Sequence, residues 1–196
     1  VWLELKGNLR LKRYLNAFFV FSMAVQTIML MAVYFGEKEI EWGSDSEKTT
    51  GLIISILVIQ LVAIVGAILT SRASSKYGNI KTLIAVNVVW MLVCVYAYFM
   101  VTPFQFYIAA GIVGLVMGGV QSLGRSTYSK FLPETEDTTS YFSFYDVAEK
   151  IGIVIGMLIF ALVDQISSMR YAILFLFIFF LVGIILLFRV PENKNV

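Results

Sequence analysis

The sequence contains no histidine and one cysteine, Cys94. Without histidine the chain lacks the commonest general base and the commonest zinc ligand, and it can form no Ser–His or Cys–His catalytic pair. A single cysteine cannot form a disulfide bond within the chain. These absences exclude most hydrolase mechanisms, so we expect no enzyme, no metal site and no cofactor.

Charged residues are also scarce. They make up 14% of the chain, against about 25% in a typical soluble domain. Hydrophobic residues make up 59%, which is too many for a chain that must cover its surface with polar groups. The composition therefore predicts an integral membrane protein. Its formal charge of +2 gives no reason to expect a nucleic-acid partner.

Six stretches are long and apolar enough to cross a bilayer. A helix needs about 20 residues to cross roughly 30 Å of hydrocarbon, and runs apolar at consecutive positions favour helices over barrel strands. We predict an all-α membrane protein with an interfacial arm (1–13), a six-helix transmembrane domain (14–188) and a cytoplasmic tail (189–196). The expected spans are 14–35, 50–71, 82–101, 103–123, 141–163 and 171–188, and only 141–163 contains charged residues.

Most basic residues fall on one side of the expected membrane, eleven against three. Because cytoplasmic loops keep lysine and arginine, we expect both termini in the cytoplasm. The opposite connection at 36–49 is acidic and contains Trp42, and we interpret it as a solvated loop with an aromatic anchor in the membrane interface. The eleven residues are Lys6, Arg10, Lys12, Arg13, Arg72, Lys76, Lys81, Arg125, Lys130, Arg189 and Lys194; the three are Lys38, Lys48 and Arg170.

A short basic segment follows the second expected span. It resembles the cytoplasmic signature between the second and third helices in each half of the major facilitator transporters. Ser75 stands where that signature carries an acidic residue, so a carboxylate cannot cap or gate a helix from this position. The residues assigned to this signature loop are Gly66, Arg72, Lys76, Gly78 and Lys81.

Three further stretches are similar to the C-terminal half of the vacuole effluxer family. They are residues 24–27 (AVQT), 118–126 (GGVQSLGRS) and 142–150 (FSFYDVAEK). The resemblance implies helices seven to twelve of a twelve-helix transporter in a bacterial inner membrane. It also implies a small-molecule solute, with amino-acid efflux as the activity of one branch.

Six helices with both ends on one side match one half of such a transporter, which is built from two inverted three-helix repeats. Residues 25–27 (VQT) and 120–122 (VQS) lie 95 positions apart, although Gln121 is nearer the end of its expected span than Gln26. The implied partners are membrane lipid, the solute and the N-terminal half of the same transporter. An isolated half could also form a non-native homodimer. The alternative is a stand-alone six-helix transporter or channel that works as a homodimer.

The span 141–163 contains Asp146, Glu149 and Lys150. A charge at a helix centre costs about 2.5 to 3.5 kcal/mol on insertion scales, which makes these residues gate or coupling candidates. At 100° per residue they share an arc of about 100°, which we expect to face protein or water. Asp146 precedes Lys150 by four residues, a spacing that favours an ion pair between them. Three roles for these charged residues remain open, namely a structural salt bridge, a gate and proton coupling.

Two glutamines lie near the expected midplane, where an amide needs a hydrogen-bond partner. The resemblance places the first helix of each three-helix repeat at the transport cavity, so Ser22 and Gln26 are the candidate solute contacts. An interhelical hydrogen bond is the other interpretation of Gln26. Gln60 is expected to join helices.

Glycines recur at small-xxx-small spacing in the fourth and fifth spans, where they allow either close packing or bending. The third and sixth spans, including Asn87 and Trp90, are expected to face lipid and to carry no site. The candidate hinges are Gly114, Gly118, Gly152 and Gly156.

Overall fold

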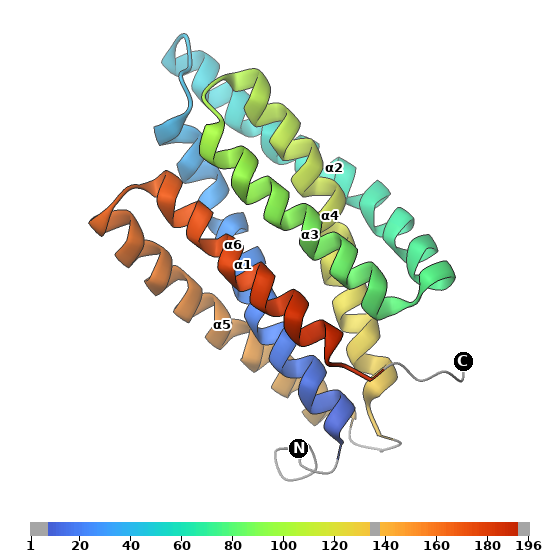
Figure 1. The fold of residues 1–196 in the computed structure, drawn as a ribbon. Helices are drawn as coiled ribbons and strands as arrows, with labels where there is room; N and C mark the ends of the chain where they lie inside the picture. The colour runs from blue at the N-terminus through green and yellow to red at the C-terminus, as the bar shows by residue number, and fades with distance from the viewer. Residues whose placement is uncertain (1–7, 134–137, 192–196) are drawn as a thin grey trace.

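The computed structural model describes residues 8–133 and 138–191, and within these ranges it contains six α-helices and no strand (Figure 1). Five of these helices are long and apolar enough to cross a membrane, and the sixth, α5, carries the charged cluster. The predicted all-α membrane protein is confirmed. The helices are α1 (Leu9–Glu39), α2 (Asp45–Tyr77), α3 (Asn79–Phe99), α4 (Pro103–Phe131), α5 (Thr138–Ile166) and α6 (Met169–Phe188).

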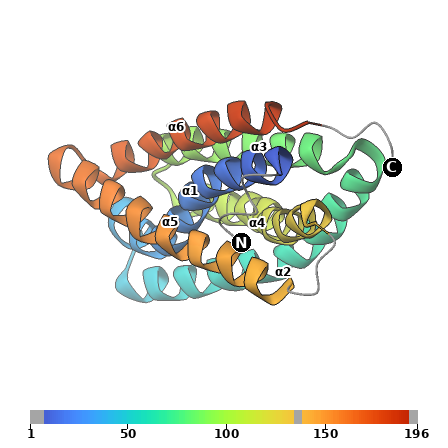
Figure 2. The ribbon, with the colours of Figure 1, turned by 90° about the horizontal axis from the view of Figure 1, so that it is seen from below.

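Helices α1 and α4 form the centre of the bundle. Helix α1 packs against α5 and α6, α4 packs against α2 and α3, and α3 packs against α6. Figure 2 shows α3 and α6 on one side of this centre and α2 and α5 on the other. If α1, α2 and α3 are matched with α4, α5 and α6 in that order, each of these contacts corresponds to another contact of the set or to itself. Two inverted three-helix repeats are expected to show this symmetry.

Helix α3 buries Asn87 and Trp90 within the bundle. Trp90 stacks on Phe180 of α6, with ring centroids 5.8 Å and planes 7° apart. Asn87 is fully buried and donates to the carbonyl oxygen of Leu83 at 2.8 Å. The expectation that Asn87 and Trp90 face lipid is therefore wrong. The exposed apolar residues of α3 include Val88, Leu92 and Val95.

Helix α1 begins earlier than its apolar run. The Oδ1 atom of Asn8 accepts a hydrogen bond from the backbone N–H of Leu11 at 3.0 Å, which caps the helix. Residues 9–13, expected in an interfacial arm, instead form the first turns of α1, and Leu11 is buried. Residues 1–7 of that arm and 192–196 of the tail lie outside the described residues.

The prediction that the signature residues form a loop is also wrong, because α2 continues through Arg72 and Lys76 to Tyr77. No glycine or proline interrupts residues 67–77, so the helix extends beyond its apolar part. Gly78 alone joins α2 to α3, and its φ of +88° is a conformation that favours glycine. Lys81 belongs to the first turn of α3.

The acidic connection is shorter than expected. Ser44 caps α2, since its hydroxyl accepts from the backbone N–H of Glu47 at 3.2 Å. Trp42 donates from Nε1 to the carbonyl oxygen of Gly36 at 2.7 Å, and its ring lies edge-on to Phe106 at 6.1 Å. Trp42 therefore packs against α1 and α4 at this end of the bundle, and its role as an anchor in the membrane interface stays a prediction.

Glycines bring α2 and α4 into close contact. A Cβ atom at Gly66 would collide with the backbone of Leu115, and one at Gly118 would collide with the backbone of Ala63. A Cβ atom at Gly114 would lie 2.8 Å from a backbone oxygen of α2. The two helices can approach this closely only because these positions carry no side chain.

Helix α5 uses glycine in the same way against α1. A Cβ atom at Gly156 would collide with Thr27 and would lie 2.8 Å from the side chain of Met23. Gly152 has more room, with its nearest neighbour 3.6 Å from the added atom. A hinge at these glycines remains a prediction.

Gly118→Ala is expected to destabilise the folded protein by about 1–3 kcal/mol, because the added methyl group overpacks the contact with α2. The measurement is the free energy of unfolding in detergent micelles. Gly111→Ala is the matched control, since no atom lies within 4 Å of an added Cβ there. Equal effects of the two substitutions would contradict the proposed packing.

Candidate functional site

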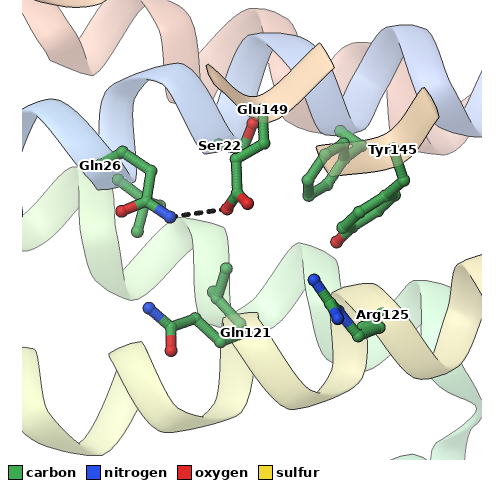
Figure 3. A pocket seen from close by; sticks show the side chains of 9 residues that line it. Ser22, Gln26, Gln121, Arg125, Tyr145 and Glu149 are labelled. Atoms are coloured by element: carbon green, nitrogen blue, oxygen red, sulfur yellow. Dashed lines mark hydrogen bonds between the residues drawn. The ribbon is translucent and has the colours of Figure 1, made fainter. Parts of the chain in front are cut away.

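A polar pocket of about 280 Å³ lies between α1, α4 and α5 (Figure 3). Polar side chains from three helices meet here in a bundle that is otherwise largely apolar. Ionisable residues within membrane-spanning helices are rare and commonly mark a functional site. The lining residues are Phe18, Ser22, Val25, Gln26, Val120, Gln121, Arg125, Tyr145 and Glu149.

The candidate solute contacts both line this pocket. Gln26 donates from Nε2 to Oε1 of Glu149 at 2.6 Å, joining α1 to α5. The amide therefore lines the pocket and forms an interhelical hydrogen bond at once. Ser22 is buried, and its hydroxyl donates to the carbonyl oxygen of Phe19 at 3.4 Å.

Gln121 lies opposite Gln26 in Figure 3. Gln26 is the 18th residue of α1 and Gln121 is the 19th residue of α4. The two glutamines thus occupy matching positions in the two repeats. Gln121 is still nearer the end of its helix than Gln26, but the difference is smaller than expected, because α4 extends beyond its apolar run to Phe131.

The charged residues of α5 have different partners from those expected. Asp146 accepts a hydrogen bond from Nη2 of Arg125 at 2.6 Å, so it pairs with α4. The predicted ion pair between Asp146 and Lys150 is wrong. The guanidinium of Arg125 on the neighbouring α4 reaches this carboxylate and forms a charge-assisted hydrogen bond with it. Lys150 is exposed and does not line the pocket.

Aromatic packing holds one wall of the pocket. Tyr145 is buried and stacks on Phe18, with ring centroids 4.1 Å apart. The guanidinium of Arg125 lies 5.6 Å from the centre of the Tyr145 ring. Figure 3 shows Arg125 and Tyr145 pointing toward each other from α4 and α5. Asp146 and Tyr145 of α5 therefore hold the guanidinium of Arg125, which is the one cation among the described residues that line the pocket.

Other predicted residues lie elsewhere. Gln60 is exposed on α2, so the expectation that it joins helices is wrong. Lys76, Gly78 and Lys81 line a second cavity at the end of the bundle. Sequence reasoning did not select Gln121 for the site, although the VQT and VQS repeat signalled it.

Comparison with known proteins identifies the family. The model of the family described as "Vacuole effluxer Atg22 like" matches residues 2–196. The chain is 34% identical over 184 residues to the uncharacterized MFS-type transporter YxiO of Bacillus subtilis strain 168. It is 26% identical over 184 residues to autophagy-related protein 22 of Eremothecium gossypii, and 24% identical over 198 residues to autophagy-related protein 22 of Kluyveromyces lactis.

The alignments cover most of this chain but less than half of each relative. They include 93% of the chain and 41% of YxiO, 87% of the chain and 35% of the Eremothecium protein, and 94% of the chain and 39% of the Kluyveromyces protein. The fold and these relatives define a multi-pass membrane protein of the transporter class. The chain belongs to the vacuole effluxer Atg22-like family, and the predicted family is confirmed.

Proposed function

We propose that the chain is one six-helix half of a secondary active transporter, which moves a small polar solute by alternating access together with a second six-helix half. The observation that carries this proposal is the polar pocket between α1, α4 and α5. Transporters built from inverted repeats bind their substrate near the midplane between rocking halves. The chain also spans only 41% of its relative YxiO, which leaves room for a second half.

The second half would cover the side of the bundle on which α2 and α5 lie (Figure 2). Both helices have long apolar surfaces that the rest of the chain leaves exposed, including Leu57, Leu61 and Ile64 on α2 and Val154 and Leu158 on α5. The charged residues at the start of α5 would then lie close to the closed interface. The excess of lysine and arginine at one end of the bundle supports a topology with both termini in the cytoplasm of a bacterial inner membrane.

The chemistry of the pocket fits a neutral amino acid. Arg125 presents a guanidinium, which binds carboxylates in a planar, two-pronged geometry. Glu149 presents a carboxylate that can accept from an ammonium group. The zwitterion of a neutral amino acid carries both complementary charges, and the family description as vacuole effluxers favours export.

Both charged groups have partners within the chain before a solute binds. Asp146 holds Arg125, and Gln26 holds Glu149. A bound zwitterion would replace Asp146 at the guanidinium and Gln26 at the carboxylate. The Arg125–Asp146 contact between α4 and α5 would then open, which makes Asp146 a gate and Glu149 the candidate for proton coupling.

Transport by the complete protein in proteoliposomes tests this proposal. We expect saturable efflux of at least one neutral amino acid, with a dependence on the proton gradient. Glu149→Gln should remove this dependence and also lower the rate of efflux, because Glu149 is the proposed partner of the ammonium group. Amino-acid amides, which lack the carboxylate, are the matched control and should not compete. Efflux that amides inhibit as strongly as amino acids would contradict the assignment of Arg125.

Cysteine labelling tests the orientation. A cysteine at Ser46 should react with an impermeant reagent from outside the cell, and a cysteine at Ser75 only after the membrane is opened. Both positions are exposed, and the native Cys94 is fully buried, so the background should be low. The opposite pattern would overturn the topology.

A further inference from the structure

Tyr145 is a buried tyrosine whose hydroxyl group makes no hydrogen bond to any of the described residues, 8–133 and 138–191. Its side chain is 3% exposed, and a tyrosine hydroxyl buried to this extent usually has a hydrogen-bond partner. Tyr145 lines the polar pocket, and Figure 3 shows its hydroxyl pointing toward the guanidinium of Arg125. The hydroxyl is therefore placed to bind a group inside the pocket.

Two other tyrosines of the same aromatic cluster use their hydroxyl groups within the chain. Tyr14 donates to the carbonyl oxygen of Gly124 at 2.6 Å, which joins α1 to α4. Tyr128 donates to the carbonyl oxygen of Tyr141 at 2.8 Å, which joins α4 to α5. These bonds explain why positions 14 and 128 carry tyrosine and not phenylalanine. They do not explain Tyr145, because a phenylalanine there could make the same ring contacts.

Ring contacts from two helices hold the Tyr145 side chain in place. Its ring stacks on Phe18 of α1, with centroids 4.1 Å apart, and lies 4.8 Å from the ring of Tyr128 of α4. Both distances are within or close to the range in which aromatic pairs attract each other. A polar group that is held in position before binding loses little conformational freedom on binding, which strengthens recognition.

Tyr145 and Glu149 lie on the same face of α5. Positions four apart in a helix stand one above the other, about 6 Å apart along its axis. Both residues line the pocket, and Arg125 enters it from α4 with its guanidinium 5.6 Å from the centre of the Tyr145 ring. The hydrogen-bond donors of Tyr145 and Arg125 are therefore neighbours, and the carboxylate of Glu149 lies about one helical turn away.

We propose that Tyr145 is a further solute-binding residue, whose hydroxyl donates a hydrogen bond to the carboxylate that Arg125 binds. This inference rests on the proposed function, since it requires a solute with a carboxylate. A tyrosine hydroxyl keeps its proton at neutral pH, so it adds a hydrogen bond without adding a second positive charge. When the solute replaces Asp146 at Arg125, the bond to Tyr145 would keep α5 connected to α4 through the solute.

Binding of tritiated L-alanine, L-valine and L-glutamine to the complete protein in detergent tests the role of Tyr145. Tyr145→Phe should weaken the binding of each amino acid that the unaltered protein binds by roughly 10- to 100-fold. The melting temperature of this variant should stay within about 2 °C of the unaltered protein, because no hydrogen bond to another described residue is lost.

Tyr128→Phe is the matched control, since it removes a hydroxyl from a neighbouring buried ring that does not line the pocket. The carbonyl group of Tyr141 loses this donor, so the melting temperature should fall by roughly 3–8 °C. The affinity of this variant for the same amino acids should change by less than about threefold.

Three outcomes would overturn this inference, and they differ in what else they overturn. Unchanged affinity in Tyr145→Phe would remove Tyr145 from the solute site and leave the proposed function intact. An equal loss of affinity in both variants would show that the packing of the aromatic cluster, and not the Tyr145 hydroxyl, determines binding. If the unaltered protein bound none of the three amino acids, the neutral amino acid of the proposed function would be contradicted together with the role of Tyr145.

Discussion

Arg125→Gln is expected to lower kcat/KM for solute transport by about 30-fold or more while leaving the stability of the protein nearly unchanged. The side chains of Arg125 and Asp146 are 56% and 48% exposed in this chain, so their ion pair contributes at most about 1 kcal/mol to folding. In the closed transporter the same guanidinium would bind the solute away from water. Loss of one partner from a desolvated charge pair costs about 2–5 kcal/mol.

The two effects are measured separately, as the initial rate of transport in proteoliposomes and as the free energy of unfolding in detergent. A purely structural salt bridge would lower transport only as far as it lowers stability. A parallel loss of both quantities would therefore contradict the proposed role of Arg125.

Exchanging the charges of Arg125 and Asp146 tests whether Arg125 acts only as a gate or also contacts the solute. In Arg125→Asp combined with Asp146→Arg, the ion pair between α4 and α5 can re-form with its charges reversed. If the pair acts only as a gate, transport should return. We expect it to remain lost, because the carboxylate of the solute would then meet an aspartate at position 125.

Arg170→Met is expected to reduce the free energy of unfolding by about 3 kcal/mol, because this arginine joins three helices at the end of the bundle opposite the α2–α3 junction. Its Nε atom donates to Oε2 of Glu39 at 2.7 Å, and Nη2 donates to the carbonyl oxygen of Glu39 at 2.9 Å. Nη1 donates to the carbonyl oxygens of Tyr98 at 2.9 Å and Met100 at 2.7 Å. The variant leaves the C-terminal ends of α1 and α3 without this cation, and Glu39 without its ion-pair partner.

Lys38→Met is the matched control. It removes the same charge on the same side of the bundle, and the ammonium of Lys38 lies over the exposed ring of Tyr34 at 4.3 Å. An exposed contact of this kind contributes about 0.5–1 kcal/mol. Similar losses in the two variants, measured by thermal or denaturant unfolding, would show that the hydrogen bonds of Arg170 add little.

The sequence was sufficient to locate the helices but not their ends. Long apolar runs determine where a chain can cross lipid, and each of the six expected spans corresponds to a helix. The ends depend instead on caps such as Asn8 and Ser44, and on polar residues that continue a helix into water. The composition of an apolar run shows neither the caps nor the polar continuation of a helix. The spans expected for α2 and α4 were therefore too short.

Part of the site could be predicted because polar residues stand out within apolar runs. Gln26, Asp146 and Glu149 are conspicuous because they interrupt apolar runs. Arg125 follows an apolar run and was assigned to a loop, and its partner lies 21 residues away on another helix. The local i, i+4 rule favours Lys150 for Asp146. Only the packing of α4 beside α5 brings the stronger partner within reach.

Transport by the chain alone and with its proposed N-terminal half tests the central claim most directly. The chain is reconstituted by itself, and in parallel it is co-expressed with the proposed N-terminal six-helix half. We predict saturable transport only when both halves are present, because the pocket on α1, α4 and α5 must close against a second set of helices. Saturable transport by the chain alone, as a monomer or a homodimer, would contradict the account and favour a stand-alone six-helix transporter.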